Sequence, residues 1–218
     1  MTRIRSCLVA AALTLSGGAL LAADNFPNAF EAAAKLKGKP AEAEAAFVTL
    51  AEAQQPSQYQ GIRQSAAYFQ AADSAGAQGQ FDRAAILAGK ISVPALKTLA
   101  TMKLLERQKK SKELLELAGS EKIETWPEPY IYDAAMCRAA AALVQGDPAL
   151  AAKDYALATL YTIDPRRKAA ARTGLGDAYG AMGKKAEAVG SYRKVLESES
   201  APEDIKKSVK AKLDKLGQ

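Results

Sequence analysis

Residue types that carry enzymatic chemistry are scarce in this 218-residue chain. It has no histidine, which excludes Ser-His-Asp and Cys-His nucleophile systems, histidine-containing zinc sites and haem ligation by histidine. Cys7 lies in an apolar N-terminal run and Cys137 in an alanine-rich run, where a lone thiol is expected to be a small buried apolar residue. The acidic residues are scattered or lie at predicted helix starts, so spacing predicts no catalytic carboxylate pair.

Gly174, Gly176 and Gly180 lie close enough together to suggest a nucleotide-binding loop. A dinucleotide loop requires G-x-G-x-x-G after a strand, but here the third glycine comes one residue late and no strand pattern precedes it. The chain also contains no Walker loop, no G-x-S-x-G elbow and no calcium-loop spacing. We therefore expect no catalysis, no cofactor and no metal site.

The same glycines belong to a helix-turn-helix pattern. Leu175 and Tyr179 lie four residues apart on one helix face, and Gly176 beside them leaves room for another backbone to approach. Gly183 ends this helix. A second apolar stripe follows at spacings of four and three, formed by Ala188, Tyr192 and Val195. Each predicted helix thus carries a face that it cannot bury alone.

The spacing L-G-x2-Y-x3-G-x4-A-x3-Y-x2-[small]-x6-P, which runs from Leu175 to Pro202, resembles the tetratricopeptide repeat (TPR). Arg172 stands where that family has Trp, and Val195 stands where it usually has Ala. The resemblance implies helix pairs stacked into a right-handed α-solenoid, with first-helix side chains lining a concave groove that binds peptides or proteins. The Lys and Asn residues with which this family binds acidic peptide C-termini are absent at such positions.

The pattern recurs along the chain. Gly146 and Gly183 are 37 residues apart, as are Tyr155 and Tyr192. We therefore predict an all-α, right-handed α-solenoid of about five TPR-like repeats at residues 26–56, 62–93, 94–122, 128–164 and 165–199, with a capping helix at 201–216. The third repeat has no glycine at its turn. The residues expected to pack the repeats are Leu175, Gly176, Tyr179, Ala188, Tyr192, Tyr155, Phe47 and Phe81.

Helix boundaries are predicted from capping residues and prolines. Asp147 and Asp164 each precede a proline and are expected to cap a helix. Ser200 is expected to cap the last helix through a capping box. Pro127 and Pro129 predict an irregular linker over residues 124–130.

Residues 1–22 have the features of a secretory signal peptide, with Arg3 and Arg5 followed by an uncharged apolar stretch. The alternative is a buried N-terminal helix. Cleavage after Ala22 or Ala23 would lower the formal charge from +6 to +4 by removing those two arginines. We expect an exported mature chain at 24–218, periplasmic or secreted, with no transmembrane segment.

The resemblance places candidate groove residues by register. They are Phe69, Asp73, Met136, Ala140, Thr173 and Asp177. Small neighbours and two aspartates predict an open, locally acidic groove floor suited to a segment carrying Lys or Arg. We expect an exported scaffold or adaptor for a protein or peptide partner. The alternatives are a helical accessory domain or subunit of a cell-envelope enzyme or assembly machine, and a self-associating homo-oligomer.

The basic residues concentrate in the last quarter of the chain. From Arg166 onward there are 13 Lys and Arg against 7 Asp and Glu. Such an excess favours either a solvated helical face or contact with an acidic partner or anionic surface. Nucleic acid is not expected, because no aromatic residues interleave with these lysines.

Overall fold

The computed structural model describes residues 26–36, 38–53, 60–119 and 121–217, and these residues form helices and no strand. The predicted all-α class is confirmed for this part of the chain. The helices are α3 (Phe26–Ala34), α4 (Pro40–Glu52), α5 (Gln60–Ala77), α6 (Phe81–Gly89), α7 (Pro94–Arg107), α8 (Ser111–Ala118), the 3-10 helix η2 (Ile123–Thr125), α9 (Glu128–Val144), α10 (Pro148–Leu160), α11 (Pro165–Ala181), α12 (Lys185–Leu196) and α13 (Glu203–Lys215). The predicted signal peptide lies outside the described residues.

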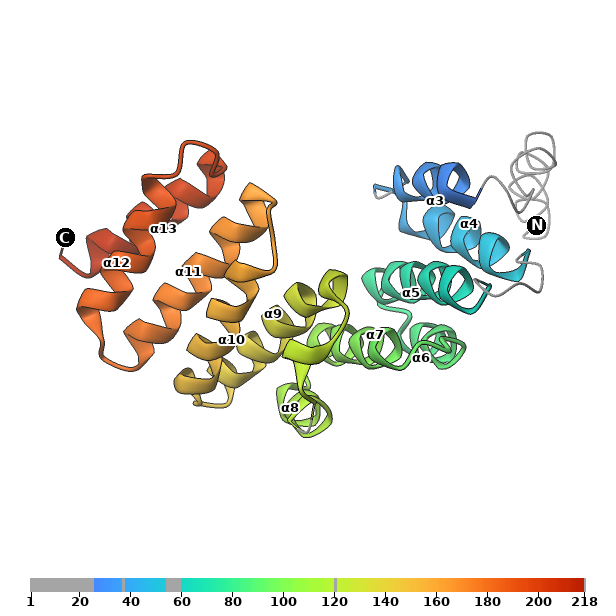
Figure 1. Cartoon of the computed structure of the whole chain (residues 1–218), viewed down its shortest axis with the longest axis horizontal. Coiled ribbons are helices and arrows are strands. Elements are labelled where there is room, and N and C mark those ends of the chain that lie inside the picture. Colours follow the sequence, from blue (N-terminus) through green and yellow to red (C-terminus); the bar gives the residue numbers. More distant parts are fainter. Residues whose placement is uncertain (1–25, 37, 54–59, 120, 218) are drawn as a thin grey trace, which may run out of the picture. The chain divides into compact units, whose positions relative to one another are not determined.

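The chain divides within α7 into two compact units, one ending at Ala100 and one beginning at Thr101. In the first unit α4 packs on α3 and α5, and α5 also packs on α6. In the second unit the helices from α9 to α13 pack on one another in chain order, as Figure 1 shows. α11 additionally contacts α9 and α13. Each of these helices therefore buries its apolar face between neighbours that are close in sequence.

Four helix-ending turns share one backbone geometry. Gly79, Gly146 and Gly183 have φ values of 74°, 79° and 72°, and Lys109 has 58°. In each turn the following amide donates to the carbonyl four residues before the left-handed residue, at 2.9–3.0 Å. This hydrogen bond defines the Schellman motif, which favours glycine because a Cβ is strained at positive φ. The glycine-free turn of the predicted third repeat is thus built in the same way, with lysine in the strained position.

Helix starts agree with the sequence at two of the predicted places. The side chains of Asp147 and Asp164 accept hydrogen bonds from the backbone amides three residues later, at 3.0 and 2.7 Å. Each therefore satisfies one of the free amides of its helix. The predicted capping box is wrong, because α13 begins at Glu203 after Pro202, without a side-chain cap, and Ser200 lies outside the helix.

The predicted irregular linker over residues 124–130 is shorter than expected. η2 ends at Thr125, and α9 begins at Glu128 with Pro129 in its first turn. Proline is tolerated there because a first-turn amide needs no intrahelical partner. The Nε1–H of Trp126 donates to Glu121 at 3.3 Å, a hydrogen bond within the connection between α8 and α9.

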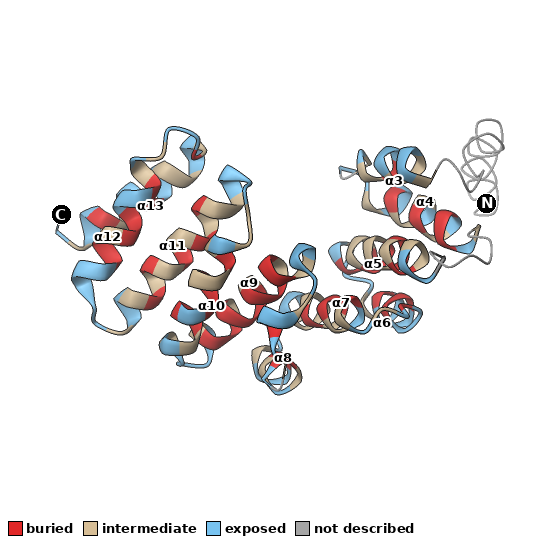
Figure 2. Cartoon of the chain, in the orientation of Figure 1, coloured by how far each residue is buried: buried red, intermediate tan, exposed pale blue. Residues whose placement is uncertain are grey.

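Tyrosine rings packed against glycines hold α11 between α10 and α12. The ring of Tyr155 lies where a Cβ on Gly174 would stand, and the ring of Tyr192 lies where a Cβ on Gly176 would stand. The close neighbour of Gly176 is thus a side chain, not the backbone expected from the sequence. Figure 2 shows buried positions along α9, α10, α11 and α12. Of the predicted packing residues, Phe47, Tyr155, Gly176, Ala188 and Tyr192 are buried, and Phe81, Leu175 and Tyr179 are half-buried.

A buried ion pair connects α9 to α10. Arg138 donates two hydrogen bonds to Asp154, at 2.6 and 2.8 Å, and their side chains are 6% and 0% exposed. The same guanidinium donates to the carbonyl of Ala118, the last residue of α8, at 3.1 Å and to the carbonyl of Glu121 at 3.0 Å. These hydrogen bonds to Asp154 raise the pKa of Arg138 although burial opposes the shift. One side chain therefore joins three consecutive segments.

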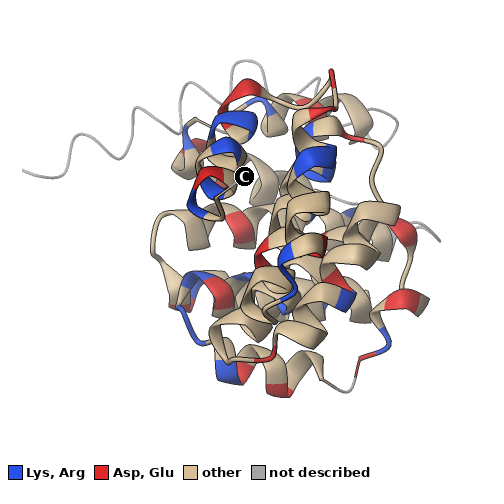
Figure 3. Cartoon of the chain, turned by 90° about the vertical axis from the view of Figure 1, so that its left-hand side faces the viewer, with Lys and Arg blue, Asp and Glu red and all other residues tan. Residues whose placement is uncertain are grey.

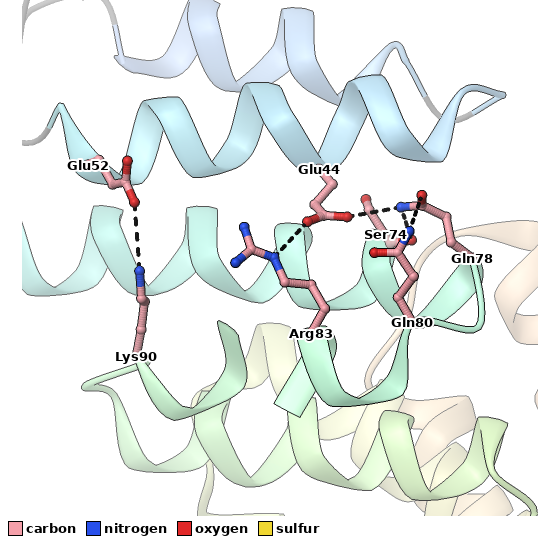
Figure 4. A network of polar contacts seen from close by, with 7 residues as sticks. All are labelled: Glu44, Glu52, Ser74, Gln78, Gln80, Arg83 and Lys90. Atoms are coloured by element: carbon pink, nitrogen blue, oxygen red, sulfur yellow. Dashed lines mark hydrogen bonds and ion pairs between the residues drawn. The ribbon is translucent and has the colours of Figure 1, made fainter. Parts of the chain in front are cut away.

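In the first unit, a polar network fixes α4 on the α5–α6 pair (Figure 4). Glu44 accepts hydrogen bonds from Arg83 at 3.1 Å and from Gln78 at 3.0 Å. Lys90 forms an ion pair with Glu52 at 3.7 Å. Glu44 is mostly buried, whereas the Lys90 pair is exposed, so the Glu44 contacts contribute more of the stabilisation.

The amphipathic helix α13 closes the second unit. Val209 and Leu213 are buried in a cluster that includes Tyr192 and Val195 of α12. Figure 3 shows basic positions beside the C-terminus, with acidic positions among them. In the described part of the chain, no helix is long and apolar enough to cross a membrane.

Candidate functional site

The structure places the six predicted groove residues at half-buried positions on first helices of helix pairs. Met136, Thr173 and Asp177 line one cavity of about 410 Å³ in the second unit. Asp73 lines another cavity of about 320 Å³ in the first unit. Phe69 and Ala140 line neither of these two cavities. Four of the six residues therefore face space that a ligand could enter.

The cavity in the second unit, the α11 cavity, is built mainly by one face of α11. Ala170, Thr173, Gly174 and Asp177 follow the spacing of three and four residues that keeps side chains on one helix face. Its other walls are Met136 of α9, Tyr155 of α10, and Asp204, Ile205 and Ser208 of α13. The space stays open because alanine and glycine occupy two of the four α11 positions.

The cavity in the first unit, the α5 cavity, is built in the same way on α5. Gln70, Asp73, Ser74 and Ala77 form the corresponding helix face. The remaining wall comes from small or apolar residues of α3 and α4, which are Ala33, Ala34, Pro40, Ala43 and Phe47.

The two cavities use the same positions relative to the turns. Asp73 and Asp177 each lie six residues before a left-handed glycine, Gly79 or Gly183. An aromatic residue from the preceding second helix, Phe47 or Tyr155, lines each cavity. The sequence assigned these two aromatic residues to packing alone. Their edges also reach the cavities, which a spacing argument cannot show.

The carboxylates of the α11 cavity are paired within the chain. Asp177 accepts hydrogen bonds from the Tyr192 hydroxyl at 2.7 Å and from the Lys212 ammonium at 2.6 Å. Asp204 binds the Arg166 guanidinium through both oxygens, at 2.9 and 3.0 Å, and these bonds lower the pKa of Asp204. The expectation of an open acidic floor is therefore wrong for this cavity, because α11 and α13 supply the compensating cations.

Tyr155 and Tyr192 are both held in their neutral form. Burial, followed by the charge of Asp177, raises the pKa of Tyr155 to about 12. Burial, then the hydrogen bond to Asp177 and its charge, raise the pKa of Tyr192 further. Neither phenol can serve as a base near neutral pH. Tyr155 lines the cavity and can donate a hydrogen bond to a ligand or pack against it, whereas the Tyr192 hydroxyl already donates to Asp177.

Cys137 does not provide a nucleophile. Its side chain is buried, its thiol lies 3.4 Å from the Glu106 carboxylate, and burial together with that charge raises the pKa of the thiol well above its usual value. A thiol of this kind stays protonated and unreactive. Among the described residues, no group of three or more Cys, Asp or Glu side chains could hold a metal ion.

Comparison with known proteins adds no family. No protein-family model matches the chain, and no curated protein is significantly similar to it.

Proposed function

We propose that this chain is an exported TPR-like scaffold or adaptor that binds a protein or peptide segment in its helix-lined cavities and performs no catalysis. In this proposal the helix pairs are about five repeats of a right-handed α-solenoid with α13 as the cap. The L-G-x2-Y pattern at Leu175 and the shared left-handed turns support it. The signal-like residues 1–22 support export to the periplasm or beyond.

The observation that supports this proposal most is that a cavity recurs at equivalent positions of two helix pairs. Each unit leaves the same helix face open, with an aspartate, small residues and an aromatic edge around it. A protein that needed these positions only for packing would fill them, because close packing stabilises a core. Two open cavities at equivalent positions therefore favour binding over packing.

The lining of the α11 cavity indicates which parts of a partner it would hold. Met136, Tyr155 and Ile205 offer an apolar wall for an aliphatic or aromatic side chain, which would supply most of the affinity. A Lys or Arg of the partner would compete with Lys212 for Asp177. Charge therefore contributes more to selectivity than to affinity.

The test is partner capture from envelope extract with variants that fill a cavity without breaking the Asp177 network. Thr173→Arg places a long side chain in the α11 cavity, and Ala77→Arg does so in the α5 cavity. Ala186→Arg and Ala85→Arg add the same side chain at exposed positions of α12 and α6, and serve as matched controls.

We expect Thr173→Arg or Ala77→Arg to lose a protein that wild type and both controls retain, at equal melting temperatures. An identical partner list for all five proteins contradicts the proposal. No partner with any of them favours self-association, which light scattering would then measure directly.

A further inference from the structure

A second surface of α11 lies away from the α11 cavity. Lys168 and Arg172 are four residues apart and share one face with Pro165 and Ala169. At 100° per residue, this face is turned about 140° around the helix from the face that lines the α11 cavity. A ligand on it would therefore not compete for that cavity.

Lys168 and Arg172 line a small cavity of about 170 Å³ against the connection between α12 and α13. Ser198 and Ser200 line its opposite side, and their hydroxyls lie 3.3 Å apart. No acidic residue lines this cavity. It therefore combines two cations and two hydroxyl groups in a space that fits a single carboxylate side chain.

Within the described residues, neither Lys168 nor Arg172 forms an ion pair. Arg172 donates only to the carbonyl of Lys194, at 3.4 Å. The nearest acids in sequence do not line the cavity, and they are Asp164, which caps α11, with Glu197 and Glu199. The other arginines of α9 and α11, which are Arg138, Arg166 and Arg167, each form an ion pair with an aspartate. Arg172 differs from them in this respect.

An exposed apolar side chain adjoins these cations. Ile163, which also lines the small cavity, is 100% exposed. An isoleucine side chain this exposed is costly to leave in water and gains most when a partner covers it. Cationic and apolar groups are thus presented side by side.

We propose that this Lys168 surface, formed by Ile163, Lys168, Arg172, Ser198 and Ser200, docks an acidic peptide segment of a partner protein. A Glu or Asp of the segment enters between Lys168 and Arg172, with the serine hydroxyls donating to its free lone pairs. A neighbouring aliphatic side chain covers Ile163. A membrane fits less well, because lipid surfaces are held by clusters of about four to eight cations, and here only two converge on a side-chain-sized cavity.

The test is an NMR titration of the purified chain with the peptide acetyl-Leu-Glu-Leu-Glu-amide, and with its Leu-Lys counterpart as the charge control. We expect a dissociation constant of roughly 1 mM, with shifts confined to the amides of the Lys168 surface and none from the Leu-Lys peptide. The Ile163 side chain is fully exposed, so Ile163→Ser should leave folding intact. This variant should weaken binding of the acidic peptide several-fold.

Lys168→Glu/Arg172→Glu should abolish binding, whereas Lys184→Glu/Lys185→Glu, the same charge change at exposed positions where α12 begins, should preserve it. Thr173→Arg, which fills the α11 cavity, should also preserve it. This result would distinguish peptide binding at the Lys168 surface from binding in the α11 cavity. Shifts that persist in Lys168→Glu/Arg172→Glu, or no saturable shift at roughly 10 mM peptide, overturn the proposal. It is also overturned if anionic phospholipid vesicles bind through Lys168 and Arg172 while the peptide does not.

Discussion

The buried pair of Arg138 and Asp154 gives a quantitative test of how the second unit is held together. In Arg138→Met, an apolar side chain of similar length replaces the guanidinium. The change removes both bonds to Asp154 and the two bonds to the carbonyls of Ala118 and Glu121. It leaves the Asp154 carboxylate, which is fully buried, without a counter-charge.

Removing one partner of a buried ion pair costs about 3–5 kcal/mol, because the remaining charge is desolvated without compensation. For a chain of this size each kcal/mol lowers the melting temperature by about 2–4 °C, so a fall of about 6–20 °C is expected. The double variant Arg138→Met/Asp154→Leu leaves no buried charge and should recover most of that loss. Recovery stays incomplete, because the two carbonyls still lack their donor.

The assays are thermal and urea denaturation followed by circular dichroism, with Arg166→Met as the control. Arg166 pairs with Asp204 at the surface, so its loss should leave the midpoint unchanged. If Arg138→Met lowers the free energy of unfolding by less than about 1 kcal/mol, the reasoning is refuted, because that is the value of a solvent-exposed ion pair. So would a double variant as unstable as the single one, because the penalty would then not be that of an unpaired charge.

Packing, turn geometry, ionisation and export each give a further prediction. Gly176→Ala should lose about 1–3 kcal/mol in urea denaturation, because the new Cβ overlaps a buried tyrosine ring. Lys109→Gly should gain up to about 1 kcal/mol by relieving a left-handed backbone, and a loss would contradict this. The pKa of Tyr155 is raised to about 12 in the folded chain, whereas it is near 10 in the unfolded chain. The stability that neutral Tyr155 contributes is therefore complete below about pH 10 and is lost as the pH rises towards 12. Tyr155→Phe should therefore show a smaller loss of stability between about pH 10 and 12. Intact mass of protein from its native host should begin near Ala23 or Asp24, and an unprocessed N-terminus would refute export.

Features that depend on neighbouring residues could be predicted from the sequence. The turns at Gly146 and Gly183 and the caps at Asp147 and Asp164 lie where expected, because a left-handed residue and an N-cap act within one helical turn. The geometry at Lys109 could not be predicted from its residue type. Its left-handed φ of 58° is a conformation that lysine disfavours, so no rule on residue types would place it there.

The register predicted the backbone positions of the site, but not its charges. Met136, Thr173 and Asp177 meet at one cavity because helical spacing fixes which residues share a face. Lys212 lies 35 residues beyond Asp177, and its contact depends on how α13 packs, which no local pattern encodes. An arginine and an aspartate within alanine-rich stretches were the only sign of the Arg138–Asp154 pair.

Photocrosslinking in living cells of the native host tests the central claim most directly, because it would capture any polypeptide that is bound in either cavity. A photoreactive amino acid replaces Thr173 or Ala77, which line the two cavities, or Ala186 or Ala85, which are exposed elsewhere on the same units. The proposed function predicts a discrete adduct with another polypeptide from Thr173 or Ala77 and none from the two controls. No adduct from either cavity position, or the same adducts from all four positions, would contradict it.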